Sequence, residues 1–241
     1  MSRIVLKLSG EALAGENDGV MRNAKGAVKL YDEQVIVGIA QQVKTLCDAG
    51  HQIAVVTGGG NIWRGRTGNE IDRVKSDQIG MLATVMNCIY VSEIFRGAGL
   101  QTQVMTPFVC GAFTELFSKD RAVKCLEEGT VVFFAGGTGH PYFSTDTGIV
   151  LRAVEVDADM ILMAKNVDGV YDSDPNKNPD ARRFDHLTYE EVVERNLQAV
   201  DMTSSVLAKE NKMEMRIFAL QAEQSIVRAA GGDFVGTTIT A

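Results

Sequence analysis

Residues 52–61 read Gln-Ile-Ala-Val-Val-Thr-Gly-Gly-Gly-Asn, an apolar run that ends directly in three consecutive glycines. The apolar run predicts a buried strand over Gln52–Thr57. Three glycines in a row lose much conformational entropy on folding, so they indicate a positive φ angle or the close approach of a ligand to the backbone. A plain tight turn is the alternative interpretation.

Two further predicted strands also run directly into loops that contain glycine. Thr130–Ala135 runs into Gly136-Gly137-Thr138-Gly139, and Arg3–Leu8 runs into Ser9-Gly10. Glycine lets backbone N–H groups approach an anion closely, and N–H groups clustered at the start of a helix favour negative charge. Three strand ends of this kind predict a site for more than one phosphorylated group, as a phosphoryl transferase requires.

Short apolar runs alternate with longer amphipathic segments along the rest of the chain. Besides the three strands above, we predict strands over Gln101–Thr106, Met160–Ala164, Glu214–Ala219 and Phe234–Ile239. We predict helices over Asp32–Asp48, Ser76–Arg96, Lys119–Glu127, Asp146–Val156, Tyr189–Asn196, Ser204–Lys209 and Ala222–Ala229. This alternation predicts an α/β fold, a three-layer α/β/α sandwich around a mostly parallel sheet, with ligands bound beyond the carboxyl ends of the strands.

The polar, turn-rich segment Asn166–Asp185 interrupts this alternation. Its prolines, Pro175 and Pro179, indicate turns, and the segment predicts a hairpin and a loop that flank the site. We expect one domain over residues 1–241, made of an N-terminal lobe (about 1–155) and a C-terminal lobe (about 156–241).

Composition narrows the class of protein. The chain has 241 residues, 45% of them hydrophobic, and a net charge of −7, which argues against a general nucleic-acid surface. Its four cysteines form no C-x-x-C pair, so we expect free thiols in a reducing compartment. We expect no leader sequence, and no apolar run that approaches the roughly 18–20 residues of a membrane span. The sequence therefore predicts a cytoplasmic protein without nucleic-acid or membrane partners.

Several familiar nucleotide-binding motifs are missing from the sequence. There is no G-x-x-x-x-G-K-[ST] of the P-loop kinases, and no G-x-G-x-x-G opens a helix after the first strand. The H-R-D and D-F-G motifs of protein kinases are missing as well. Phosphate binding in this chain must therefore use another design.

Two cationic residues are candidates for phosphate contacts. Lys7 is the penultimate residue of an apolar strand, so its ammonium group reaches the loop layer and can neutralise charge on a transferring phosphoryl group. The alternative is a lysine that only extends from a strand end into solvent. Arg64 follows the glycine triplet at a distance that lets its guanidinium clamp a phosphate bidentately, or it is a solvated loop arginine.

Acidic and hydroxyl residues near predicted helix starts have two interpretations. Asp77 either caps or electrostatically complements the start of the helix that follows, as its spacing favours, or it accepts hydrogen bonds from ribose hydroxyls. Thr145 is expected to be an N-cap and a phosphate donor at once. Asp201, just before another predicted helix, is formally another cap.

The remaining candidates lie in two loops. Tyr142 or Phe143 packs on a base or fills the core, and His140 shares no metal-ligand spacing with the other two histidines, so we expect it to be a loop residue. The second loop, Val167–Pro175, lacks the residue spacing of a calcium-binding loop. Its sequence is better explained by two turns joined by a short strand. In it, we expect Tyr171 to face an adenine and Asp174 to hold a magnesium ion through water.

Five motifs together resemble the bacterial uridylate kinases of the amino acid kinase superfamily, over nearly the whole chain. They are Lys7-Leu8-Ser9-Gly10-Glu11-Ala12, Gly58–Asn61 with Arg64-Gly65, Asp77 with Gly80-Met81-Leu82-Ala83-Thr84, Gly137–Asp146, and Val167-Asp168-Gly169-Val170-Tyr171 with Asp174-Pro175. The lysine motif and the glycine triplet are common to the superfamily. The third and fourth motifs look particular to the uridylate kinase branch.

The resemblance implies ATP-dependent phosphorylation of UMP to UDP, with Mg²⁺ as cofactor, an acceptor-side N-terminal lobe and an ATP-side C-terminal lobe. The residues it implies for ATP are Lys7, Leu8, Ser9, Gly10, Gly60, Arg64, Asn166, Tyr171 and Asp174. Those it implies for UMP are Gly59, Asp77, Thr138, Gly139, His140, Pro141, Tyr142, Phe143, Ser144 and Thr145, with Asp77 on the ribose. Its implied catalytic residues are Lys7, Arg64, Asp146 and Asp201, the two aspartates orienting the lysine and the metal. Attack by an already ionised phosphate oxygen needs no general base.

The chain departs from the family pattern in two places. Ala164–Val167 is one residue shorter than in many relatives, so either Lys165 or Asn166 fills the adenine-side position. Glu16–Lys29 departs from the pattern that is usual in the family after the first loop. This departure bears on regulation and not on catalysis. The resemblance also implies a homohexamer that is activated by GTP and inhibited by UTP, and the apolar helix over Ile79–Phe95 is compatible with a subunit interface.

Two other functions stay open as alternatives. The first is a sister kinase that phosphorylates a carboxylate or carbamate, against which Asp77 counts because an acidic side chain repels such substrates. The second is a non-catalytic nucleotide sensor. The joint presence of Lys7, Asp146, Asp174 and Asp201 counts against it, since binding alone does not demand all four.

Overall fold

The computed structural model describes residues 1–14, 30–63, 71–175, 177–197 and 200–241, and its main feature is a nine-stranded sheet. The strand order is β4-β3-β5-β2-β1-β6-β10-β11-β9. The strands are β1 (Arg3–Leu8), β2 (Gln52–Thr57), β3 (Thr102–Thr106), β4 (Glu115–Leu116), β5 (Val131–Phe134), β6 (Met160–Lys165), β9 (His186–Thr188), β10 (Glu214–Ala219) and β11 (Gly236–Thr240). Neighbouring strands pair in parallel except β10 and β11, which are antiparallel. The predicted, mostly parallel sheet is confirmed.

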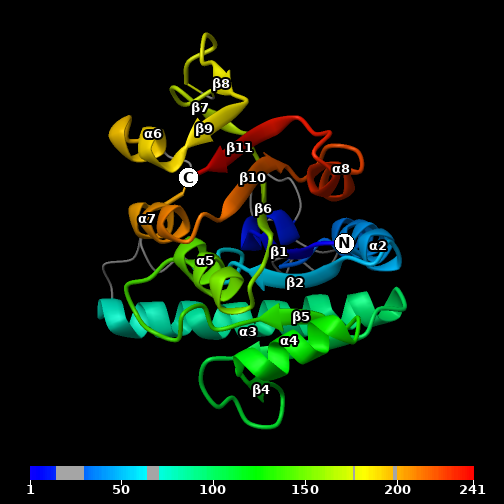
Figure 1. Ribbon diagram of the computed structural model, residues 1–241. Coiled ribbons are helices and arrows are strands. Elements are labelled where there is room, and N and C mark those ends of the chain that lie inside the picture. Colours follow the sequence, from blue (N-terminus) through cyan, green and yellow to red (C-terminus); the bar gives the residue numbers. More distant parts are fainter. Residues whose placement is uncertain (15–29, 64–70, 176, 198–199) are drawn as a thin grey trace, which may run out of the picture.

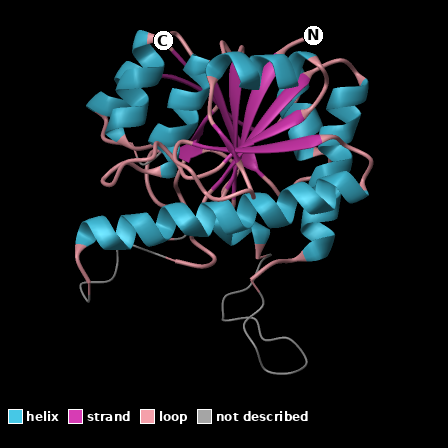
Figure 2. Cartoon of the chain, turned by 90° about the horizontal axis from the view of Figure 1, so that it is seen from below, coloured by secondary structure: helices cyan, strands magenta, loops and turns pink. Residues whose placement is uncertain are grey.

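Helices cover both faces of this sheet (Figures 1 and 2). The helices that pack on one face are α2 (Glu33–Asp48), α3 (Arg73–Gly97) and α8 (Ser225–Gly231). The helices that pack on the other face are α4 (Lys119–Glu127), α5 (Thr145–Glu155), α6 (Tyr189–Glu194) and α7 (Met202–Glu210). A single turn, α1 (Gly10–Leu13), follows β1. The predicted three-layer α/β/α arrangement is therefore confirmed.

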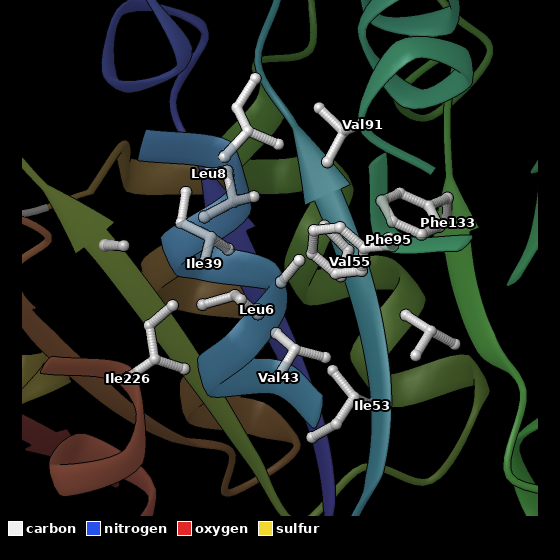
Figure 3. Packing of buried hydrophobic residues seen from close by; sticks show 14 of the residues in the cluster. Leu6, Leu8, Ile39, Val43, Ile53, Val55, Val91, Phe95, Phe133 and Ile226 are labelled. Atoms are coloured by element: carbon white, nitrogen blue, oxygen red, sulfur yellow. The ribbon is translucent and has the colours of Figure 1, made fainter. Parts of the chain in front are cut away.

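The central strand β1 is buried on both faces because its side chains alternate between the two cores. Leu6 and Leu8 pack with α2 and α3, as Figure 3 shows, whereas Val5 faces the layer that contains α5. Lys7 follows Val5 on that second face, between β2 and β6. The sheet thus holds the backbone of Lys7 rigidly at the centre of the molecule.

The segment between residues 166 and 185 contains the predicted hairpin. It is built from β7 (Val170–Tyr171) and β8 (Arg183–Phe184), which pair antiparallel and project beyond the main sheet (Figure 1). Arg183 contacts Asp168 at 2.8 Å and Asp185 at 3.2 Å. These ion pairs fix the hairpin next to the end of β6.

Helix α3 needs a correction to the prediction that no apolar run approaches the length of a membrane span. An 18-residue window of this 25-residue helix reaches a mean hydropathy of 1.3, and 44% of that window is buried. Val91 and Phe95 lie in the core, where the Phe95 ring meets Phe133 of β5 edge-on at 5.2 Å (Figure 3). The core helix of a globular protein can reach this length and hydropathy, and one side of α3 packs into the core against the sheet.

Candidate active site

The parallel strands β1, β2 and β5 end at one edge of the sheet, and the loops that follow them meet there. The Gly58 N–H donates to the Leu8 carbonyl oxygen at 2.9 Å. A Cβ atom on Gly10 would lie 2.6 Å from the Gly60 nitrogen, so only glycine allows the first two loops to pack this closely. The two predicted phosphate loops therefore form one continuous surface.

The loop after β5 is shaped by glycines with positive φ angles. Gly136, Gly137 and Gly139 have φ values of 80°, 59° and 84°, which residues with a side chain rarely adopt. The Gly136 N–H donates to the Thr84 hydroxyl of α3 at 2.8 Å. This bond fixes the loop against α3, on the side of the helix that also approaches Gly59.

A cavity of about 240 Å³ lies between these loops and the first turns of α3, which is close to the lower limit of small-molecule sites. The residues that line it are Gly59, Gly60, Trp63, Ser76, Asp77, Gly80, Met81, Thr84, Gly137, Thr138, His140, Phe143, Ser144 and Thr145. Most residues predicted for UMP are in this set. Gly139, Pro141 and Tyr142, which were also predicted, belong to the same loop but do not line the cavity.

Asp77 projects from the second turn of α3 into the cavity. The prediction that it caps or begins this helix is wrong, because α3 starts at Arg73 and Asp72 is the N-cap, accepting from the Lys75 N–H at 3.2 Å. The Oδ2 atom of Asp77 accepts from Arg73 Nε and from the Tyr142 N–H, both at 2.8 Å. Asp77 therefore joins the start of α3 to the loop after β5.

The two aromatic residues of this loop point in different directions. Phe143 lines the cavity, whereas Tyr142 is 64% exposed and its ring lies against the Arg73 guanidinium. Neither ring fills the core. Phe143 is therefore the ring that can pack on a ligand in the cavity.

Lys7 and Asp146 form a half-buried ion pair beside the cavity, in which Lys7 Nζ contacts Asp146 Oδ1. Asp146 belongs to the first turn of α5, whose N-cap is Ser144 rather than the predicted Thr145. The Ser144 hydroxyl accepts from the Thr147 N–H at 3.1 Å, and Thr145 is the first helical residue. The ion pair directs the lysine toward the N-terminus of α5.

Asp201 is the N-cap of α7, as predicted, and it also holds α5. Its carboxylate accepts from the Ser204 N–H at 3.0 Å, from the Thr147 hydroxyl at 3.2 Å and from the Ser144 hydroxyl. Three donors thus bind this carboxylate. The arrangement suits a residue that positions the start of α5.

Lys165, the last residue of β6, lies on the same face of the sheet as Lys7. Lys7 is in register with Met163, and side chains two residues apart on a strand share a face. Strand spacing places the two lysine α-carbons roughly 8 Å apart. Burial lowers the pKa of Lys165, and the positive charge of Lys7 lowers it further, whereas Asp146 acts in the opposite direction. Asn166 is exposed.

The other residues predicted for ATP do not lie together: Tyr171 and Asp174 belong to the β7–β8 hairpin, whereas Ser9 lies at the start of α1. The Tyr171 hydroxyl donates to Asp168 Oδ1 at 2.6 Å. Asp174 is exposed and pairs with Lys177 at 3.2 Å. Ser9 caps α1, accepting from the Ala12 N–H at 3.1 Å. Arg64, predicted to clamp a phosphate, lies outside the described residues.

Known proteins share this chain's sequence and architecture. Residues 2–219 match the amino acid kinase family. The uridylate kinase of Limosilactobacillus reuteri is 44% identical over 241 residues, which cover 98% of this chain and 96% of that protein. The chain belongs to the uridylate kinases of the amino acid kinase family.

Two solved structures of the family agree with the fold. The UMP kinase of Bacillus anthracis superposes with a TM-score of 0.90 at 34% identity, covering 99% of this chain and 96% of that one. The UMP kinase of Ureaplasma parvum gives a TM-score of 0.89 at 32% identity, covering 100% and 99%. The described residues therefore have the amino acid kinase fold.

Asn87 of α3 supports the site of this family member and was missed by sequence reasoning. Its side chain is fully buried, and its amide donates to the Gly58 carbonyl at 2.7 Å and to Asn61 Oδ1 at 2.8 Å. A buried amide in an apolar helix needs hydrogen-bond partners. An asparagine within an apolar helical pattern is therefore the signal in the sequence that could have identified Asn87. Trp63, also missed, lines the cavity and donates to the Ser76 hydroxyl at 3.0 Å.

Magnesium is the cofactor expected for a kinase, and the described side chains offer it no preformed cage. They contain no group of three or more His, Cys, Asp or Glu residues that could hold a metal ion. Mg²⁺ in kinases is commonly bound by substrate phosphates, water and one or two carboxylates. The site therefore fits an ion that arrives with the nucleotide and not one held in a protein cage.

Proposed function

We propose that this protein transfers the γ-phosphoryl group of ATP to UMP and forms UDP. The cavity is the observation that carries this proposal, because its walls offer a partner for each part of a nucleoside monophosphate. The glycine loops and the start of α5 offer N–H donors for a phosphate, Asp77 offers an acceptor for ribose hydroxyls, and Phe143 offers a face for a base. The similarity to uridylate kinases specifies uridine as the base.

The acceptor side of the site is suited to UMP rather than to a carboxylate substrate. Asp77 carries negative charge into the cavity, where it repels a carboxylate but accepts from a diol. Ser144 and Thr145 open the eleven-residue helix α5, whose N–H groups and dipole favour the UMP phosphate. These features disfavour the carboxylate and carbamate kinases.

The donor side centres on Lys7. We assign Lys7 to the transferring phosphoryl group, Asp146 to orienting the Lys7 ammonium, and Asp201 to positioning α5 through its hydroxyl contacts. Lys165 shares the face and edge of Lys7, so we place it on the phosphates of ATP and leave the nucleoside side to Asn166 and Tyr171.

The reaction requires no general base. A phosphate oxygen of UMP, already ionised at neutral pH, attacks the γ-phosphorus of ATP, and the bond from that phosphorus to the bridging oxygen breaks, so that ADP leaves with the electron pair. Mg²⁺ bound to the phosphates would neutralise their charge. Asp146, which contacts the Lys7 ammonium, would be placed to orient such an ion, while Asp174, which is exposed on the hairpin, would act only through water.

ADP release with Mg²⁺ and ATP tests the function, with UMP compared against CMP, dUMP, acetylglutamate, glutamate and carbamate. Selective turnover of UMP is the expected result. Turnover of a carboxylate or carbamate instead of UMP would show that the phosphoryl acceptor is not UMP. Binding of ATP or UMP without turnover of any acceptor would favour a nucleotide sensor.

Assembly, regulation and location are further parts of the proposal. Helix α3 carries an exposed apolar stripe formed by Ile79, Leu82, Met86 and Ile89. This stripe supports self-association into the homohexamer that the family resemblance implies. Activation by GTP and inhibition by UTP follow from the same resemblance. All four cysteines are free thiols, which supports the reducing environment of the cytoplasm.

A further inference from the structure

The Asp77 carboxylate divides its two oxygens between different tasks. Oδ2 accepts two hydrogen bonds, from Arg73 Nε and from the Tyr142 N–H, both at 2.8 Å. No residue of the described ranges donates to Oδ1 in the hydrogen bonds of the structure, and Asp77 lines the cavity. One oxygen therefore holds the protein together, and the other is left for a ligand.

Arg73 and Tyr142 also contact each other. The Arg73 guanidinium lies 5.3 Å from the centre of the Tyr142 ring, within the range of a cation–π contact. Tyr142 has a φ angle of 72°, which is unfavourable for a residue with a side chain, and the residue is 64% exposed instead of packed in the core. The unfavourable backbone is therefore held by the bond to Asp77 and by the ring contact with Arg73.

The charge of Arg73 bears on ligand binding as well. A nucleoside monophosphate brings a phosphate into the same cavity as the Asp77 carboxylate, and the two negative groups repel each other. Arg73 lies one helical turn before Asp77 and offsets its charge. The Arg73 side chain is 40% exposed, so the ion pair contributes little to the stability of the fold.

We propose that Arg73 and Tyr142 are positioning residues for UMP, which fix the Asp77 carboxylate so that its free oxygen meets the ribose and which anchor the loop after β5 over the bound nucleotide. This inference rests on the proposed function; it adds Arg73, which no motif includes, and gives Tyr142 a positioning role in place of direct contact with the base. It predicts that disruption of the contact weakens UMP binding and leaves ATP binding unchanged.

Steady-state kinetics of five variants test the proposal. Arg73→Gln removes the charge, Arg73→Lys keeps it with a different donor, and Asp77→Asn weakens the ribose acceptor. Tyr142→Gly removes the ring but keeps the N–H donor. Lys75→Gln is the matched control, because it removes an exposed positive charge from the same helical turn without a contact to Asp77.

We expect Arg73→Gln to raise the KM for UMP about tenfold, as for loss of a hydrogen bond to a charged group, with KM for ATP within about twofold of the wild type. Arg73→Lys should recover part of that loss, and Lys75→Gln should match the wild type. Because the ring acts through Arg73, adding Tyr142→Gly to Arg73→Gln should raise the KM for UMP no further.

Other outcomes identify which step is wrong. An unchanged KM for UMP in Arg73→Gln, while Asp77→Asn loses UMP binding, would overturn the positioning role and leave the function intact. Equal rises in KM for ATP and UMP would show a structural effect only. An unchanged KM for UMP in Asp77→Asn would show that Asp77 does not contact the ribose. If the wild-type protein does not phosphorylate UMP, the proposed function fails.

Discussion

At the scale of single residues, the largest effect is expected for Lys7. Lys7→Ala removes the positive charge beside the N-terminus of α5, and we expect kcat to fall by about 10³-fold, or about 4 kcal/mol, as for loss of a preorganised electrostatic contact. Lys44→Ala is the control, since Lys44 pairs with Asp48 on the surface of α2. If the kcat of Lys7→Ala is close to that of the wild type, Lys7 does not take part in the mechanism.

The second lysine of the site gives a separate prediction. Lys165→Gln should raise the KM for ATP and lower kcat by about tenfold each, because a half-buried cation near the donor phosphates is lost. Lys165→Arg keeps the charge and should recover most of the activity. Kinetics with ATP as the varied substrate test this, and equal activity of the Gln and Arg variants would contradict a role of the charge.

Site residues could be predicted from the sequence where a local motif identified them. The glycine loops and Asp77 are examples, since the types of residue reveal their chemistry. Local spacing failed to identify the caps of α3 and α5, because Asp72 lies five residues before Asp77 and Ser144 one residue before Thr145. The place of Lys165 beside Lys7 depends on the register of β1 and β6, which are far apart in the sequence.

At the scale of secondary structure elements, α3 connects the core to the phosphate loops through Asn87. Asn87→Ala removes the amide that donates to the buried Gly58 carbonyl and to Asn61 Oδ1. We expect the free energy of unfolding to fall by about 1–3 kcal/mol and the Tm by roughly 3–10 °C. The KM for UMP should rise, since the loop after β2 loses its support.

Thermal unfolding and kinetics check this prediction, with Glu93→Ala as the control. Glu93 lies on the same helix, is 74% exposed and pairs only with Arg96 among the described residues, so its removal should change the Tm by little. An Asn87→Ala protein as stable as the Glu93→Ala protein would show that the buried amide does not hold the loop.

The long elements could be predicted from apolar pattern, and the short ones could not. β1, β2, β10 and α4 begin and end where the sequence predicted, because each carries enough buried side chains to set its own limits. β4 and β9 have only two and three residues and exist because neighbouring strands offer partners. Their position depends on the assembled sheet and not on their own sequence.

At the scale of the whole molecule, the outer side of α3 predicts self-association. Ile79, Leu82, Met86 and Ile89 are 38%, 50%, 51% and 40% exposed. Spacings of three and four residues place them on one face of the helix, opposite the side that packs on the sheet. An apolar stripe of this kind is unfavourable in water, and a second copy of the chain can cover it.

The double variant Leu82→Glu, Met86→Glu should therefore dissociate the assembly, because each carboxylate loses its hydration when the stripe is covered. Light scattering after size-exclusion chromatography measures the mass, and we expect a multimer for the wild type and a smaller species for the variant. Met202→Glu is the control, since Met202 is 62% exposed on α7 in the opposite helical layer. A monomeric wild type, or an unchanged mass in the double variant, would exclude this face of α3 as the interface. Since α3 also carries Asp77 into the cavity and holds the loop after β2 through Asn87, dissociation should lower the activity even though both substituted residues point away from the site.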